Sequence, residues 1–120
     1  MISSLLLRVS TVLLLCGLVF GIYMGIREDF TLAPAHAHLN LIGFVLMFLT
    51  GLYYRIVPAA GSGPLAKIQA SLHIVGAIVL PIGVALVLTG GTGIVVIVGS
   101  LIVLAAMALF AWIVFQTTTA

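Results

Sequence analysis

Charged residues are scarce in this sequence. Only 5% of its 120 residues are Asp, Glu, Lys or Arg, whereas 64% are hydrophobic. A soluble domain carries about 25% charged residues, so this chain could not cover a water-exposed surface. The net charge of +2 comes from scattered cations, which offer no basic patch to a nucleic acid. The composition excludes a soluble domain and a nucleic-acid partner, and it indicates an integral membrane protein in contact with the lipid bilayer.

Cysteines and acidic residues are equally rare. Cys16 is the only cysteine, which excludes an internal disulfide and a cysteine-based metal site. The two acidic residues, Glu28 and Asp29, are adjacent, so no hydrophobic run contains a carboxylate. Ionisable chemistry within the membrane is therefore left to histidine.

Four hydrophobic runs are long enough for membrane helices, which need about 20 apolar residues. They cover residues 5–26, 35–57, 65–88 and 94–115. The fourth run is rich in valine and isoleucine, but an isolated strand would leave its backbone groups unpaired in lipid, so a helix is expected there too. The sequence predicts an all-α integral membrane four-helix bundle formed by a single domain, residues 1–120.

The cations predict an orientation. Arg8, Arg55 and Lys67 fall at one side of the membrane, and Arg27 falls at the other. Cytoplasmic ends of membrane helices carry more Lys and Arg. We therefore expect a protein of the bacterial inner membrane with both termini on the cytoplasmic side. A cleaved signal peptide is disfavoured, since the first hydrophobic run exceeds about 15 residues.

Glycines and aromatic residues suggest how the helices pack. Gly17, Gly21 and Gly25 form overlapping G-x-x-x-G steps, which predict a groove for close approach of another helix. Four other glycines are weaker signals of the same kind, and three residues at the end of the second run are expected to be interface anchors. These are Gly43, Gly51, Gly76 and Gly83, and Tyr53, Tyr54 and Arg55.

Three histidines are the candidate functional residues. His36 and His38 open the second run, and His73 lies within the third. Residues two apart on a helix point about 200° apart, so His36 and His38 would serve different sites. Asn40, one turn beyond His36, is expected to orient it. The alternatives are interfacial histidines in contact with water and, for His73, a buried ring hydrogen-bonded to a carbonyl.

The ligand set favours haem over other metal centres. Haem needs only one or two axial ligands and an apolar slot between helices. Copper or zinc needs three or four protein ligands, and His73 is expected to lie about 10 Å deeper than the other two histidines. We therefore predict haem, preferably of b type, with copper as the weaker alternative, and His36 and His38 as the metal ligands.

The segment from Asp29 to Pro58 resembles part of the catalytic subunit of haem-copper oxidases, subunit I. The likeness is nearest to C-type cytochrome oxidases and nitric oxide reductases. It consists of the His36-Ala37-His38 pattern, a run of small and aromatic residues including Gly43-Phe44, and the closing segment Gly51–Pro58. His73 is placed like a histidine near the start of the family's next helix.

This resemblance implies roles and an assembly. His36 and His38 would be axial ligands of two haems on opposite faces of one helix. The chain would match one of three four-helix arcs, so a homotrimer would supply twelve helices. The family's His-His copper ligands and intramembrane carboxylates are missing here, which disfavours a complete oxygen-reducing centre.

Three functions remain open from the sequence. The first is a haem-binding membrane protein that transfers electrons with a respiratory-chain redox partner or binds a diatomic gas. The second is a non-catalytic assembly or interaction protein of respiratory membranes. The third is a small transporter, disfavoured because four-helix multidrug exporters rely on an acidic residue in the first helix.

Overall fold

The computed structural model describes residues 1–117, which are almost entirely helical and contain no strand. Residues 118–120 of the predicted domain lie outside this part. Four apolar segments are long enough to cross a membrane, so the predicted all-α multi-pass architecture is confirmed. They are α1 (Ile2–Arg27), a second span made of α2 (Ala33–Asn40), the π-helix η1 (Leu41–Leu46) and α3 (Met47–Ile56), then α5 (Pro64–Leu88) and α6 (Ile94–Thr117).

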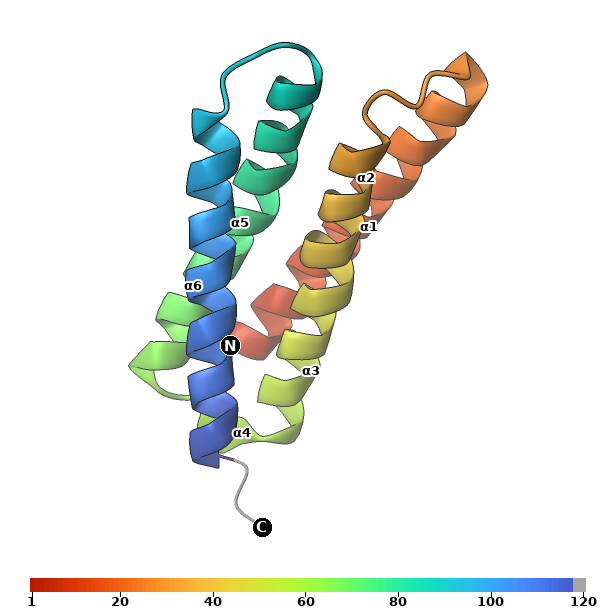
Figure 1. The fold of residues 1–120 in the computed structure, drawn as a ribbon. Coiled ribbons are helices and arrows are strands. Elements are labelled where there is room, and N and C mark those ends of the chain that lie inside the picture. Colours follow the sequence, from red (N-terminus) through yellow and green to blue (C-terminus); the bar gives the residue numbers. More distant parts are fainter. Residues whose placement is uncertain (118–120) are drawn as a thin grey trace.

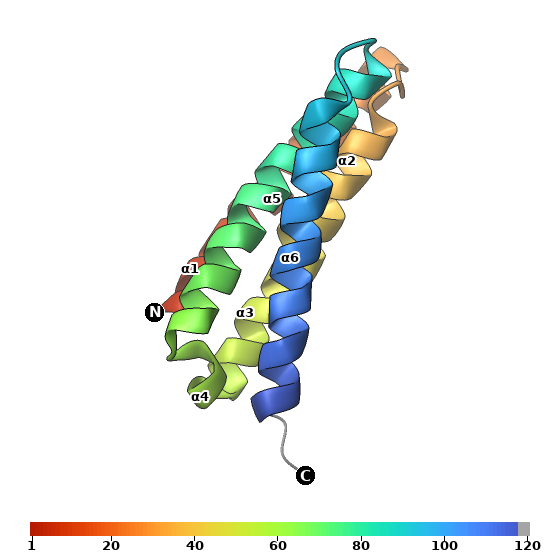
Figure 2. The same ribbon diagram turned by 60° about the vertical axis from the view of Figure 1, so that its left-hand side comes forward.

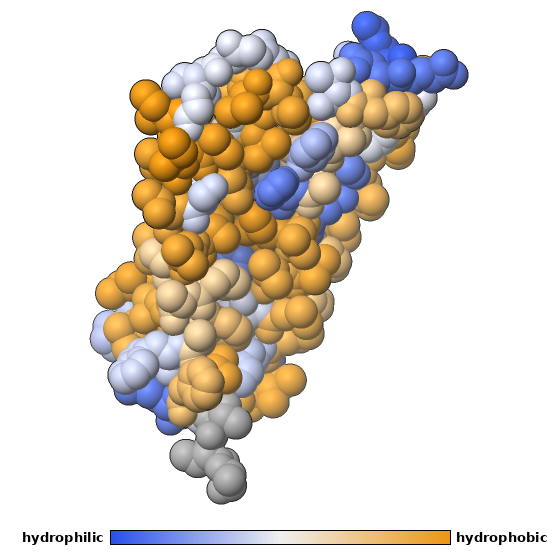
Figure 3. Space-filling view, in the orientation of Figure 1, coloured by the Kyte–Doolittle hydropathy of each residue, from blue (hydrophilic) through white to orange (hydrophobic). Residues whose placement is uncertain are grey.

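The four spans form two antiparallel pairs that lie side by side (Figures 1 and 2). α1 packs mainly against the second span, and α6 packs mainly against α5. The pairs meet where α2 and η1 contact α5. Because successive spans run in opposite directions, the start of α1 and the end of α6 both lie in the lower half of Figure 1. Hydrophobic side chains dominate the face shown in Figure 3, as expected for a surface in lipid.

The second span departs from the regular helix that the sequence predicted. Residues 41–46 form a π-helix, and the span ends at Ile56. The following connector is not a simple loop, because Pro58–Gly61 forms the short helix α4. A π segment changes which backbone groups bond to each other. A carbonyl of such a segment can therefore need a hydrogen bond from a neighbouring side chain.

The closest helix contact joins α5 and α6 through two glycines. A Cβ atom added to Gly83 would lie 2.5 Å from the Cα of Val96, and one added to Gly99 would lie 2.8 Å from the Cα of Leu80. Backbone therefore packs on backbone at both positions. Gly83 was a weak signal in the sequence and Gly99 was not singled out. By contrast, Gly25, the last glycine of the G-x-x-x-G series, has open space around it.

We predict that Gly83→Ala destabilises the protein by about 1–3 kcal/mol, because the methyl group must push apart two backbones. The measurement is unfolding of the purified protein in detergent, followed by circular dichroism. Gly25→Ala, a matched helix substitution in open space, should leave the unfolding midpoint unchanged or slightly higher. Equal midpoints for wild type and Gly83→Ala would contradict this packing.

Candidate functional site: three histidines in three environments

His73 is buried and uses both of its ring nitrogens within the chain. Its Nε2 lies 3.0 Å from the carbonyl oxygen of Ile42, which is part of η1. A carbonyl can only accept, so Nε2 carries the proton and Nδ1 is the acceptor. The amide nitrogen of Gln69, one turn earlier on α5, lies 3.5 Å from that Nδ1. His73 thus has the carbonyl partner that one of the two interpretations of the sequence expected.

The contacts of His73 extend into a buried polar network. The Tyr54 hydroxyl donates to Gln69 Oε1 at 2.9 Å, and Gln69 Nε2 lies 3.4 Å from the carbonyl of Ala106 on α6. Tyr54 is therefore a core residue with 2% of its surface exposed, and its prediction as an interface anchor is wrong. Gln69 was missed as a site residue, although its spacing of four from His73 places both on one helix face.

We predict that His73→Leu lowers the free energy of unfolding by about 1–3 kcal/mol, because it removes the partner of the Ile42 carbonyl and one of the two partners of the Gln69 amide. Unfolding in detergent measures the effect. Ser71→Ala is the matched control on α5, since the Ser71 hydroxyl bonds only to the carbonyl of Lys67 on the same helix. A loss no larger than that of Ser71→Ala would rule out the network as a stabilising contact.

His36 and Asn40 occupy the glycine groove of α1. The imidazole of His36 covers Gly21, where an added Cβ would meet ring atoms at 3.0 and 3.3 Å. The side-chain oxygen of Asn40 fills the place of a Cβ on Gly17. The predicted groove is therefore filled by two polar side chains rather than by a backbone. It brings the amide nitrogen of Asn40 to 3.5 Å from His36 Nε2, as expected of an orienting residue.

Two polar atoms in this contact lack a hydrogen-bond partner among the described residues. They are His36 Nδ1 and Asn40 Oδ1, and both are buried. The ring of His36 also packs edge-on against Phe20, with centroids 5.9 Å apart. The Asn40 amide nitrogen can only donate, so Nε2 of His36 is the acceptor and the unpaired Nδ1 carries the proton. An unpaired N–H is costly inside a membrane protein.

We predict that Gly17→Ala destabilises the α1–α2 contact, because its methyl group collides with Asn40. Asn40→Ala should relieve the collision, so the double variant should lose less stability than the two single losses added together. A double-mutant cycle of unfolding free energies measures this coupling, for which about 1 kcal/mol or more is expected. Strict additivity would mean that the two residues do not touch.

His38 differs from the other two histidines because its N–H bonds within its own helix and its other ring nitrogen is a free acceptor among the residues that the structure describes. Its Nδ1 lies 2.6 Å from the carbonyl oxygen of Pro34, so Nδ1 carries the proton and Nε2 holds an exposed lone pair. Within residues 1–117 that Nε2 makes no hydrogen bond. His38 is half-buried, and three apolar residues follow it on the exposed side of the same span. They are Leu41, Val45 and Leu49.

The structure keeps the three histidines apart. His36 faces α1, His73 faces η1, and His38 contacts its own helix. The described residues contain no group of three or more His, Cys, Asp or Glu side chains able to share one metal ion. Each histidine can therefore act chemically only as a single ligand from this chain.

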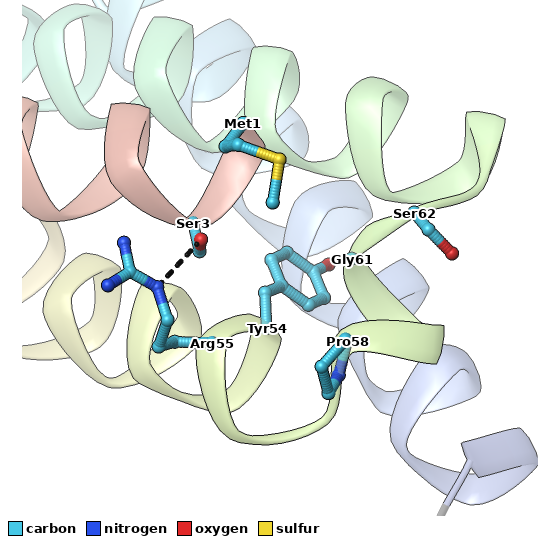
Figure 4. A pocket seen from close by; sticks show the side chains of 7 residues that line it. All are labelled: Met1, Ser3, Tyr54, Arg55, Pro58, Gly61 and Ser62. Atoms are coloured by element: carbon cyan, nitrogen blue, oxygen red, sulfur yellow. Dashed lines mark hydrogen bonds between the residues drawn. The ribbon is translucent and has the colours of Figure 1, made fainter.

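A pocket of about 230 Å³ lies at the other end of the bundle from α2 (Figure 4). Arg55 borders it, but its guanidinium group is directed at α1, where Nε and an Nη donate to the hydroxyls of Ser3 and Ser4 at 3.2 and 2.8 Å. The arginine ties the end of α3 to the start of α1, and it leaves the pocket wall to Tyr54, Pro58 and neighbouring residues.

Comparisons with protein families, curated proteins and solved structures find no match to this chain. The likeness to haem-copper oxidases therefore depends on the quoted sequence motifs alone.

Proposed function

We propose that this chain is a haem-binding membrane protein in which His38 provides an axial imidazole to a b-type haem. The carrying observation is the hydrogen bond from His38 Nδ1 to the Pro34 carbonyl. Ligating histidines donate their second ring nitrogen to such an acceptor, which holds the tautomer and strengthens the ligand. The exposed apolar residues beyond His38 match the chemistry of a macrocycle lying along the span.

His36 is the second candidate ligand, for a separate site, and Asn40 is its orienting partner. The acceptor nitrogen of His36 is Nε2, which lies 3.5 Å from the Asn40 amide, and a bound iron would have to replace that contact. His73 is the least suitable of the predicted cofactor residues, because both of its nitrogens already have partners. Copper is less suitable than haem, because no group of three potential ligands exists within residues 1–117.

A bound haem would supply either one-electron redox chemistry or an open coordination position for a diatomic gas. The protein's part would be to hold the His38 ring in one orientation and to exclude water with apolar side chains. Because α6 packs on α5 rather than on α2, one chain leaves the His38 side uncovered. A second copy would cover it, and we propose the homotrimer that the resemblance implies.

We also propose the membrane, the orientation of the chain and the kind of redox partner. Arg8, Arg55 and Lys67 belong to the end that carries both termini, and this end would face the cytoplasm of a bacterial inner membrane. Electrons would be exchanged there or at the opposite face with a respiratory-chain partner.

A non-catalytic assembly role in respiratory membranes is the second candidate. It is favoured by the packing of His36, Asn40 and His73, since all three serve contacts between helices. Such residues would be needed for folding even in a protein without a cofactor.

We predict a Soret band in the protein purified in detergent from haem-replete cells, and loss of most of that band in His38→Gly. Adding imidazole to His38→Gly should restore the band, because free imidazole can replace a missing ligand but cannot repair a packing defect. Ser71→Ala, with an exposed hydroxyl on α5, is the control. A colourless wild-type protein, or a band unaffected by His38→Gly, would refute His38 ligation. A stable monomer in a mass measurement of the detergent complex would refute the trimer.

A further inference from the structure

A small cavity at the turn between α1 and α2 carries two opposite charges. Its volume is about 70 Å³. Arg27 and Asp29 form its polar wall, and its remaining lining residues are Phe20, Tyr23, Met24 and Leu32. In Figure 3 this turn is the most hydrophilic part of an otherwise apolar end. It lies where a membrane helix meets the lipid headgroups, just beyond the end of α1 at Arg27.

The two charges do not neutralise each other directly. Among the described residues, Arg27 and Asp29 form no ion pair within 4.0 Å. The guanidinium of Arg27 lies over the ring of Tyr23, 5.7 Å from its centroid. One carboxylate oxygen of Asp29 accepts from the backbone and hydroxyl of Thr31, at 3.1 and 2.7 Å. These Thr31 bonds lower the pKa of Asp29, so the carboxylate stays ionised at neutral pH.

Apolar grooves continue from this cavity into the membrane. A groove of about 560 Å³ on α1 shares Phe20 and Tyr23 with the charged cavity. A cleft of about 260 Å³ between α1, α2 and α5 shares Cys16 and Phe20 with that groove. A cation and an anion therefore lie next to two adjoining apolar hollows on the outer surface of the helices.

We propose that this surface binds a phospholipid of the phosphatidylethanolamine type. Its phosphate would lie against Arg27 and its primary ammonium against Asp29. One acyl chain would follow the groove past Phe20 and Cys16 into the cleft between α1, α2 and α5. Phosphate accepts charge-assisted bonds from a guanidinium, and an ammonium donates them to a carboxylate. A lipid with only a negative head would meet Asp29 as a like charge, and a choline head has no N–H to donate. This inference does not depend on haem binding.

The test uses the full chain in detergent with an equimolar mixture of ethanolamine, choline and glycerol phospholipids that have identical acyl chains. Native mass spectrometry counts the lipid retained in each class. We predict that wild type retains the ethanolamine lipid about two- to fivefold over the choline lipid, since single exposed charge contacts are weak. The glycerol lipid should be retained least.

Asp29→Asn should lower retention of the ethanolamine lipid to that of the choline lipid, and Arg27→Gln should lower both. Glu28→Gln is the matched control, because it removes a neighbouring carboxylate that does not line the cavity. Equal effects of Asp29→Asn and Glu28→Gln, or preferential retention of the glycerol lipid, would overturn the proposal.

A second pair of variants tests the acyl groove. Ala85→Leu fills the cleft between α1, α2 and α5 and should reduce retention of all three lipids alike, with their ratio unchanged. Ala105→Leu adds the same bulk to the exposed side of α6 and should change nothing. If both substitutions reduce lipid retention equally, the cleft does not hold the acyl chain of the lipid.

Discussion

The absence of water inside the bilayer is the constraint on which the rest of this structure depends. Each backbone or side-chain polar group in the hydrocarbon region needs a partner from the protein. The π segment η1 alters the backbone ladder of the second span, and His73 donates to it at the Ile42 carbonyl. Through Gln69 the same network reaches Tyr54 on α3 and Ala106 on α6. Three of the four spans are thereby joined at one buried point.

This constraint also separates the histidines by what they can still do. Both ring nitrogens of His73 have hydrogen-bond partners within the protein, so this residue serves the packing of the helices. His36 is an intermediate case, wedged into the α1 groove with a weak contact to Asn40 and one nitrogen unpaired. Only His38 satisfies its own N–H locally and keeps a lone pair outside the packing. His38 is therefore the histidine that the packing of the helices uses least.

Hydropathy was sufficient to predict the spans but not their contacts. Whether a segment crosses the membrane depends on its composition, and each predicted run contains or matches a helix to within a few residues. Which faces meet cannot be deduced in the same way, because lipid-facing and buried side chains are equally apolar. The π-helix, the burial of Tyr54 and the Gly99 contact all escaped prediction for this reason. The Gln69–His73 spacing was the one available signal for the polar network.

The glycine contact between α5 and α6 lies at the same end of the bundle as His38. Gly83 and Gly99 let the two backbones approach, which holds α6 against α5 in the half of the bundle that contains α2. At the opposite end α6 contacts the second span, where Tyr53 bonds to Thr117 at 2.7 Å and stacks edge-on with Phe110. α6 therefore reaches the second span at the end where α3 stops, whereas at the end that contains His38 only α5, among the described helices, packs across the two pairs.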